Sequence, residues 1–294
     1  MPDTRAYWLH CLSPTHVGTG RGVGYIDLPL YRDATTDWPA VPGSSIKGVW
    51  ADHFHREAGV KRDKREENAL LKAAFGTAGT ETSTAGALIA TDARLVCLPV
   101  RSFKGTFAWA TSPLALKFMR RDLDLAGFKG LPKAPEPTGA DSILIPKGSA
   151  LTVGTQVALE EFDLVHGSDE NTENWADKLA GWVFRDAAWR TEFKKRFAIL
   201  PDLLFDHFAA TGTEVVTRVK IDDEKKTVVG GALWTEEALP AESILWGLVQ
   251  CDPRPGVDAD GLVKKYASGE LPLQIGGKAS VGRGKARLVF SEGK

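Results

Sequence analysis

The stretch His16-Val-Gly-Thr-Gly-Arg-Gly-Val-Gly24-Tyr-Ile-Asp27-Leu-Pro29 carries much of the structural information in this chain. Glycine falls on every second residue from Gly18 to Gly24. Because glycine has no Cβ, such a loop can turn through positive φ or let a ligand approach the backbone closely. The loop leads to Asp27, a single carboxylate between apolar neighbours, and Pro29 ends any helix there. The pattern predicts a binding loop that presents Asp27 from a bend.

A second stretch, Pro42-Gly43-Ser44-Ser45-Ile-Lys47-Gly48, predicts the start of a helix. From residue 46 onward apolar residues recur at helical spacing, and the serines before them suit an N-cap. Lys47 would lie in the first turn, beside free backbone N–H groups and the positive end of the helix dipole, which suits a phosphate. The alternative is one more solvated helix lysine. The position favours a phosphate, because the dipole disfavours a cation there unless an anion shares the site.

A third glycine-rich stretch runs Gly276-Gly277-Lys278-Ala-Ser-Val-Gly282-Arg283-Gly284-Lys285. In a phosphate-binding P-loop, serine or threonine follows the lysine and another glycine lies five residues before the Gly-Lys pair. Here alanine follows each lysine and that other glycine is missing, so this stretch is not a P-loop. The glycines at 18–24 likewise lack the third glycine of a dinucleotide fingerprint. A glycine loop with three cations can follow a sugar-phosphate backbone, or it can be a hairpin turn with solvated charges. Spacing alone favours neither reading.

Composition indicates an ordinary globular chain of 294 residues, 43% hydrophobic and 26% charged. It contains no long apolar run and no signal-peptide pattern, so we expect a cytoplasmic protein that does not enter a membrane. The net charge of −1 argues against a protein that binds nucleic acid over its whole surface, but it is compatible with a local binding groove. Charge is nevertheless sorted along the chain: residues 101–133 carry seven cations against two acids, and residues 160–192 carry nine acids against three cations. This suits a subunit that holds a polyanion on one side and other proteins on the other.

The three cysteines, Cys11, Cys97 and Cys251, are isolated from one another along the chain. They form no Cys-x-x-Cys pair, so neither a disulfide framework nor a zinc site is encoded. We expect three buried free thiols.

Hydrophobic periodicity and turn residues predict an α+β fold, an antiparallel sheet with helices on one face and large insertions. Strands and helices alternate without the regular period of a parallel βαβ protein. A hairpin with a charged tip is expected over 214–235. The other expected strands are 7–12, 152–165, 243–249, 271–275 and 286–290, and residues 87–100 suit a buried strand or a bent hairpin. The expected helices are 44–57, 61–75, 113–125, 174–200 and 258–268, with loop at 76–86.

Four sequence words together resemble one known family: HVGTGRGVGYIDLP (16–29), PGSSIKG (42–48), LWTEEALP (233–240) and QIGGKASVGRGKARL (274–288). In this order, and in a chain of this length, they resemble the repeated backbone subunit of type III-B CRISPR RNA-guided effector complexes (the Cmr complex), within the repeat-associated mysterious protein (RAMP) superfamily. The resemblance is specific at these words and loose between them. It implies a single RAMP domain over 1–294 with a ferredoxin-like (RNA-recognition-motif-like) palm, a thumb hairpin at 213–240, finger insertions at 45–85 and 101–150, and a helical insertion at 160–210.

The resemblance also implies roles for particular residues. Asp27 would be the ribonuclease carboxylate and a possible metal ligand, where residue type alone favours a turn-capping aspartate. His16 would be a general acid/base or positioning group near the scissile phosphate, or else a structural loop histidine. Glu236, ahead of Glu237, would assist Asp27 across a subunit boundary, or both are exposed acids at a strand end; Ala238 replaces an aromatic residue often found in the family. The implied RNA contacts are Gly43, Ser44, Ser45, Lys47, Gly276, Gly277, Lys278 and Arg283.

We therefore expect a subunit that polymerises along a guide CRISPR RNA and cleaves complementary target RNA at regular intervals. The resemblance implies a divalent ion, magnesium or manganese, that no dedicated protein cage holds. Its partners would be the guide, the target, further copies of itself and other Cmr subunits. One alternative is a non-catalytic RNA-binding scaffold. Another is a small-molecule hydrolase in which Asp27 and Glu236 act as paired carboxylates.

Overall fold

A large mixed sheet forms the centre of the protein in the computed structural model, which describes residues 4–20, 22, 25–61, 64, 67–77, 83–222, 224–252 and 256–292. Within these residues twelve strands join in this sheet. They are β1 (Thr4–Cys11), β2 (Ala40–Val41), β5 (Leu88–Ala90), β6 (Ala93–Arg101), β7 (Phe107–Thr111), β8 (Ser142–Leu144), β9 (Gln156–Leu159), β10 (Phe162–Gly167), β11 (Phe197–Ile199), β14 (Ile244–Cys251), β15 (Glu270–Gln274) and β16 (Lys285–Phe290).

The sheet runs in the order β15-β16-β1-β14-β6-β7-β11-β8-β10-β9, with β2 paired to β6 and β5 to β14. Most neighbours are antiparallel, but β7 with β11 and β8 with β10 are parallel. The sheet is therefore mixed, whereas an antiparallel sheet was expected. Strand β1, from the start of the chain, lies between β14 and β16, which come from its C-terminal part, with Tyr7 opposite both Gly247 and Phe290.

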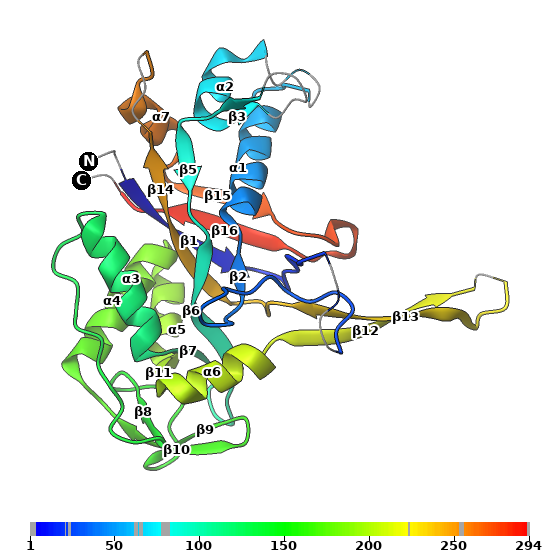
Figure 1. Ribbon diagram of the computed structural model, residues 1–294. Coiled ribbons are helices and arrows are strands. Elements are labelled where there is room, and N and C mark those ends of the chain that lie inside the picture. The colour runs from blue at the N-terminus through cyan, green and yellow to red at the C-terminus, as the bar shows by residue number, and fades with distance from the viewer. Residues whose placement is uncertain are drawn as a thin grey trace.

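Both faces of this sheet are buried. Along β1, Tyr7 and Leu9 pack into one hydrophobic cluster, whereas Ala6 and Trp8 pack into another on the opposite face, as the alternation of side chains along a strand requires. Helices therefore cover both faces, not one as expected (Figure 1). On the Tyr7 face lie α1 (Gly43–Glu57), α2 (Ala69–Phe75), α6 (Asp202–Thr211) and α7 (Ala259–Tyr266); on the Trp8 face lie α3 (Pro113–Leu125), α4 (Glu170–Val183) and α5 (Ala187–Arg196).

The long helix expected over 174–200 is wrong: the chain forms α4 and α5, followed by β11. Phe184 takes an extended conformation and is buried between the two helices. Asp186 then caps α5 by accepting hydrogen bonds from the N–H groups of Ala188 and Trp189. A buried aromatic and a strong cap thus break a helix that periodicity alone would continue.

Other segments differ less from expectation. The helix expected over 61–75 is present only as α2, which Asn68 caps; residues 62, 63, 65 and 66 lie outside the described residues. The strand expected over 152–165 is the hairpin β9–β10, which turns at Glu160 with φ of 48°. Short strands β3 (Gly76–Thr77) and β4 (Thr84–Ala85) pair within the expected loop at 76–86. The helices expected over 44–57, 113–125 and 258–268 are confirmed within two residues at each end.

The hairpin expected over 214–235 is confirmed as β12 (Glu214–Ile221) and β13 (Val228–Ala238), which pair only with each other as strands and extend away from the sheet (Figure 1). We call these two strands the arm. The register places Glu214 opposite Ala238, Val216 opposite Glu236 and Arg218 opposite Trp234. Since side chains alternate along each strand, these residues share one face of the arm, and Thr235 and Glu237 lie on the other.

Cys11, Cys97 and Cys251 are buried free thiols, as expected. Within the described part of the chain, no helix combines the length and the apolar character that crossing a membrane would require.

Candidate functional site

Asp27 is exposed and is held against the base of the arm by Thr235. Its Oδ2 accepts hydrogen bonds from the backbone N–H of Thr235 at 2.8 Å and from the Thr235 hydroxyl at 3.0 Å. These bonds hold the pKa of the Asp27 carboxyl below its usual value, because they stabilise the charged form. The site therefore presents an ionised carboxylate with a fixed orientation.

The backbone around Asp27 pairs with the edge of β13. The N–H of Leu28 donates to the carbonyl of Thr235 at 3.0 Å, and the N–H of Glu237 donates to the carbonyl of Leu28 at 3.0 Å. Asp27 itself lies in a bend between two bridge residues, as the glycine and proline pattern predicted. Of the alternating glycines, Gly18, Gly20 and Gly22 are described, whereas Gly24 lies outside the described residues.

His16 is anchored on the same strand edge. Its Nδ1 lies 2.6 Å from the carbonyl oxygen of Glu237. Because a carbonyl can only accept, Nδ1 carries the proton, which leaves Nε2 of the neutral ring with a free lone pair. A Cβ on Gly18 would lie only 2.7 Å from Nε2, so the glycine lets the loop pass over the imidazole. The anchors at 235 and 237 are two residues apart, about 7 Å along a strand.

Glu236 lies between Thr235 and Glu237 in sequence but points to the opposite face of the arm. Its side chain is only 5% exposed, and its Oε1 accepts from Lys278 Nζ at 2.7 Å and from Trp234 Nε1 at 2.7 Å, while Arg218 Nε lies 3.5 Å from Oε2. Burial alone would raise the pKa of this carboxyl, but the bonds from Lys278 and Trp234 and the nearby Lys278 and Arg218 charges together lower the pKa to about 2. Glu236 is a buried, ionised acceptor.

The opposite orientations of Asp27 and Glu236 bear on the hydrolase alternative. Thr235, which binds Asp27, and Glu236 alternate along β13. Two carboxylates that share one small substrate must converge on it. Within one chain these two face away from each other across the arm, so this arrangement does not support a paired-carboxylate hydrolase.

Glu237 is a structural anchor for the segment that leads away from Asp27. It is 2% exposed. Its carboxylate binds Arg32 at 2.5 Å, the hydroxyl of Thr213 at 2.8 Å and the backbone N–H of Leu30 at 2.9 Å. Its carbonyl binds His16. Glu237 therefore fixes both flanks of the Asp27 loop to the arm.

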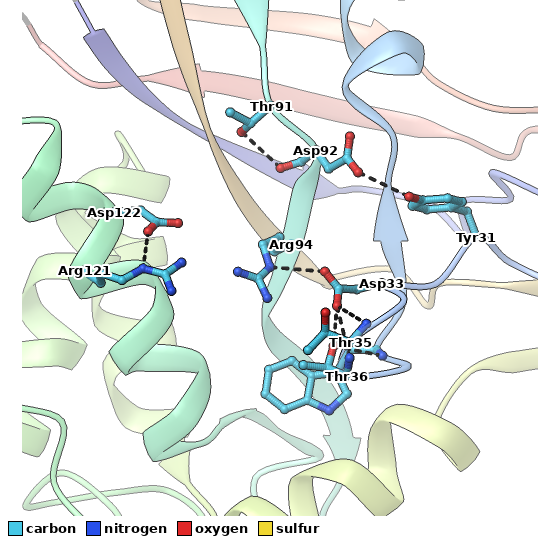
Figure 2. Close-up of polar contacts among 10 residues, drawn as sticks. Tyr31, Asp33, Thr35, Thr36, Thr91, Asp92, Arg94, Arg121 and Asp122 are labelled. Atoms are coloured by element: carbon cyan, nitrogen blue, oxygen red, sulfur yellow. Dashed lines mark hydrogen bonds and ion pairs between the residues drawn. The ribbon is translucent and has the colours of Figure 1, made fainter. Parts of the chain in front are cut away.

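The start of α1 differs from expectation at its cap. The N-cap residue is Pro42, and neither Ser44 nor Ser45 caps the helix through its side chain. Instead the N–H of Gly43 donates to Oδ1 of Asp92 at 2.7 Å. Oδ2 of Asp92 also accepts from the hydroxyl of Tyr31 at 3.3 Å (Figure 2). A carboxylate of the protein thus already occupies part of the helix N-terminus.

Gly43 serves close packing at this point. A Cβ there would lie 2.4 Å from the carbonyl oxygen of Ala90, so only glycine lets α1 begin directly against the turn between β5 and β6. Ser44 is exposed, and Ser45 and Lys47 are half-buried. The helix predicted from the PGSSIKG word is confirmed, and the serine cap is wrong.

The C-terminal glycine loop, residues 276–284, lies against both the His16 segment and the arm. The N–H of Gly277 donates to the carbonyl of His16 at 3.0 Å, and a Cβ on Gly276 would lie 2.0 Å from that oxygen. Lys278 binds Glu236, and Arg283 Nη2 binds Glu214 Oε1 at 2.5 Å. The structure therefore brings this loop together with His16 and Glu236, and both of its expected RNA-binding cations pair with carboxylates of the arm.

Sequence reasoning missed three residues of this site: Thr235, Asp92 and Glu214. Thr235 lies inside the LWTEEALP word, directly before the two glutamates, so the word itself was a signal. Asp92 and Glu214 lie in no such word. Their roles depend on partners 49 and 69 residues away along the chain.

Similarity to known proteins identifies the family of this chain. Residues 8–287 match the sequence profile of the RAMP superfamily. The chain belongs to the RAMP superfamily. It is 33% identical over 290 residues to the "CRISPR system Cmr endoribonuclease Cmr4" of Pyrococcus furiosus, covering 97% of this chain and 94% of that protein.

Solved structures of RAMP proteins share the fold. The crystal structure of oligomeric Cmr4 from Pyrococcus furiosus superimposes with a TM-score of 0.77 at 28% identity, over the full length of both chains. A chain of the type III-B Cmr-beta complex in its apo state gives a TM-score of 0.76 at 20% identity, covering 98% of this chain and 97% of that chain. This RAMP chain therefore has the mixed α/β fold of the Cmr4 proteins along its whole length.

Proposed function

We propose that this protein is a guide-RNA-binding backbone subunit of a type III-B CRISPR effector, which polymerises along the guide and cleaves complementary target RNA at regular intervals. Its Pyrococcus furiosus relative carries the name of a Cmr endoribonuclease and has been crystallised as an oligomer. The catalytic part of this proposal rests on Asp27, an exposed, ionised carboxylate that Thr235 fixes at the base of the projecting arm.

The fold can be assigned in finer detail on the same basis. We assign the central strands β1, β6, β14 and β16, with α1, to a ferredoxin-like palm. The arm is the thumb, within the predicted 213–240 span, residues 45–85 and 101–150 are the fingers, and 160–210 is a helical insertion. This division agrees with the arm standing apart from the sheet (Figure 1).

The arm has the surface that an unstacked nucleotide needs. On the face that carries Thr235, the apolar side chains of Val219 and Leu233 lie opposite each other and are 42% and 63% exposed. A base displaced from the guide–target duplex can pack on such a surface. Its phosphodiester can then adopt the in-line geometry that stacked A-form RNA forbids, once for each subunit. Regular spacing of the cuts follows from regular spacing of the arms.

His16 and Asp27 lie beside this surface and have complementary roles. The Nε2 lone pair of His16 can take the proton of the attacking hydroxyl or water as the new P–O bond forms, and the leaving oxygen takes a proton from solvent. Asp27 orients the attacking group with its fixed negative charge. Both groups are anchored on one strand edge, so they keep their spacing as the RNA enters.

The residues present do not fit a resident metal ion. Across the part of the chain that the structure describes, no group of three or more His, Cys, Asp or Glu side chains is placed to hold one. Oδ2 of Asp27 already accepts two hydrogen bonds from Thr235, which leaves Oδ1 as a single oxygen ligand for a metal ion. We propose that a magnesium or manganese ion, as expected, is held chiefly by RNA phosphate and water.

The experiment replaces Asp27 in the assembled complex. Asp27→Asn and Asp27→Ala complexes should bind target RNA like the wild type and lose cutting at every interval. Asp163→Asn, which removes an exposed carboxylate on β10, is the matched control and should cut normally. Binding is measured by gel shift and cutting by the ladder of labelled fragments. An Asp27→Asn complex that still produces the ladder would leave the non-catalytic scaffold as the function of this chain.

A further inference from the structure

We propose that Glu236 and Glu214 are positioning residues: they fasten the C-terminal glycine loop to the base of the arm, and so set the place at which Asp27 meets the RNA. This inference rests on the proposed function. The inference gives Glu236 a role different from the proton transfer or metal binding that its closeness to Asp27 would suggest.

Two ion pairs make the connection, one on each strand of the arm. Lys278 binds Glu236 on β13, and Arg283 binds Glu214 on β12. Glu214 and Glu236 lie on the same face of the arm, the face turned toward the loop. The Arg283 side chain is only 12% exposed and that of Glu236 only 5%, so solvent screens these pairs far less than surface pairs.

The other side of the loop is attached to the segment that contains His16. Gly277 donates to the carbonyl of His16 at 3.0 Å, and Gly284 donates to the carbonyl of Pro14 at 2.9 Å. Gly276 and Gly284 have φ of 76° and 78°, and Lys278 has φ of 65°, so the loop is folded into one specific shape. The loop therefore bridges the His16 segment and the arm.

This bridge controls the position of Asp27 because of where each contact falls on β13. Thr235 holds Asp27 on one face of the strand, and the next residue, Glu236, holds Lys278 on the other. A rotation of the arm relative to the loop therefore moves Asp27 relative to the loop by the same rotation. An RNA strand that touches both is cut at the phosphate which this fixed spacing selects.

The environment of Glu236 agrees with a positioning role. Its Oε1 already accepts from both Lys278 and Trp234, and Arg218 lies beside its Oε2. These groups keep the carboxylate ionised and reduce its basicity, so at neutral pH it neither supplies nor readily accepts a proton.

The test uses the assembled complex with guide and labelled target RNA. Glu236→Gln keeps the size of the side chain and removes its charge. It should leave target affinity nearly unchanged, slow cutting by about tenfold, a loss equivalent to ~1.4 kcal/mol, and spread the cuts to neighbouring phosphates. Glu236→Lys should be worse, because the new ammonium would face both Lys278 and Arg218 and could not accept the hydrogen bond from Trp234. Glu224→Gln, an equal charge change near the tip of the arm, is the control and should cut like the wild type.

A milder variant covers the case in which Glu236→Gln does not fold. Glu214→Gln removes the other ion pair at a side chain that is 34% exposed, and it should also spread the cut positions. Complete loss of cutting at every position in Glu236→Gln, with target binding intact and normal cutting in Glu214→Gln, would overturn the inference, because it would place Glu236 in the chemistry.

A second measurement separates this inference from the proposed function. Hydrogen exchange on the protein without RNA should show faster exchange of the Gly277 and Gly284 amides in Glu236→Gln and normal exchange in Glu224→Gln. This result does not depend on RNA cleavage, and unchanged exchange in both variants would overturn the inference. If Asp27→Asn still cuts, the proposed function fails, whereas the attachment of the loop is judged by exchange alone.

Discussion

Thr235 determines how the Asp27 carboxylate is held, because its hydroxyl both donates to Asp27 Oδ2 and accepts from the Asp27 N–H, each at 3.0 Å. Thr235→Val keeps the shape of the side chain and removes the hydroxyl, and we expect target cutting to slow by about tenfold, or ~1.4 kcal/mol. These hydrogen bonds lower the pKa of Asp27. Without the hydroxyl this pKa rises toward its usual value, and the acidic limb of the pH–rate profile moves to higher pH.

The pH–rate profile of the assembled complex checks this prediction, and Thr235→Ser, which keeps the hydroxyl, is the control. Thr235→Ser should follow the wild-type profile. If the valine variant has the same acidic limb as the serine variant, the hydroxyl does not set the protonation of Asp27.

Gly276 and Gly282 form a natural pair for testing the contact between the glycine loop and His16. Both have positive φ, 76° and 79°, so alanine is strained at either position by roughly 1–2 kcal/mol. A Cβ at Gly276 would also lie 2.0 Å from the His16 carbonyl, whereas open space surrounds Gly282. Gly276→Ala should therefore lower the free energy of unfolding well beyond Gly282→Ala in urea titrations. Equal losses would mean that the loop moves away from His16 at little cost.

Residue types in local words predicted where cations and carboxylates lie, but not their partners within the protein. The sequence placed Asp27 on a bend, and the structure agrees. Lys278 and Arg283 were expected to contact RNA, and in the structure they pair with Glu236 and Glu214. The Arg283 pair joins residues 69 apart in the chain. Such a pairing depends on the path of the whole arm, which no local pattern contains.

At the scale of elements, helix α1 offers two glycines with opposite expected effects. Gly43 begins the helix, and a Cβ there would lie 2.4 Å from the Ala90 carbonyl; Gly48 lies inside the helix with nothing within 4 Å of an added Cβ. Gly48→Ala should raise the free energy of unfolding by roughly 0.5–1 kcal/mol, because alanine loses less backbone entropy in a helix. Gly43→Ala should lower it by about 1–3 kcal/mol through the clash.

Chemical denaturation of the two variants, compared with the wild type, checks this prediction. The two changes differ only in position, so helix propensity alone would make both stabilising. A stable Gly43→Ala protein would show that α1 can begin further from the turn between β5 and β6.

Element boundaries were predictable where a local cap and a periodic pattern agree. Ser112 caps α3 by accepting from the Ala115 N–H, and Asp258 caps α7 by accepting from the Gly261 N–H, and both helices were predicted. At α1 the serines were expected as caps, but Asp92, in the turn between β5 and β6, accepts a hydrogen bond from the first N–H of the helix. The split between α4 and α5 was missed because Phe184 continues the aromatic period while its backbone is extended.

At the scale of the whole molecule, the sequence indicated an α+β class but not the two-sided sheet. Strands such as β2, β8 and β11 have two or three residues, too few for a period to be visible. Strands β11 and β8 extend the sheet from β7 toward its far edge, where parallel pairs enter, and β2 pairs with β6 beside this path. Helices on both faces follow from β1, β6 and β14, whose residues are almost all buried.

The stability of the whole chain toward acid should depend on Glu236. The pKa of this carboxyl is about 2 in the folded protein and ordinarily 4.5. A group with a lowered folded pKa stabilises the fold fully above its ordinary pKa, and this contribution, on the order of 3 kcal/mol, is lost as the pH falls from about 4.5 toward 2. Glu236→Gln should therefore lower the free energy of unfolding at pH 7, and its difference from the wild type should shrink below pH 4.5.

Urea titrations of the isolated chain at a series of pH values between 7 and 3 measure that difference. Glu224→Gln is the control near the tip of the arm, where no ion pair joins it to another described residue, and its difference from the wild type should stay near zero throughout. A Glu236→Gln difference that remains constant down to pH 3 would show that the protein draws no stability from the charge of this carboxylate. The loop would then be held by the Arg283–Glu214 ion pair and by the backbone hydrogen bonds of Gly277 and Gly284.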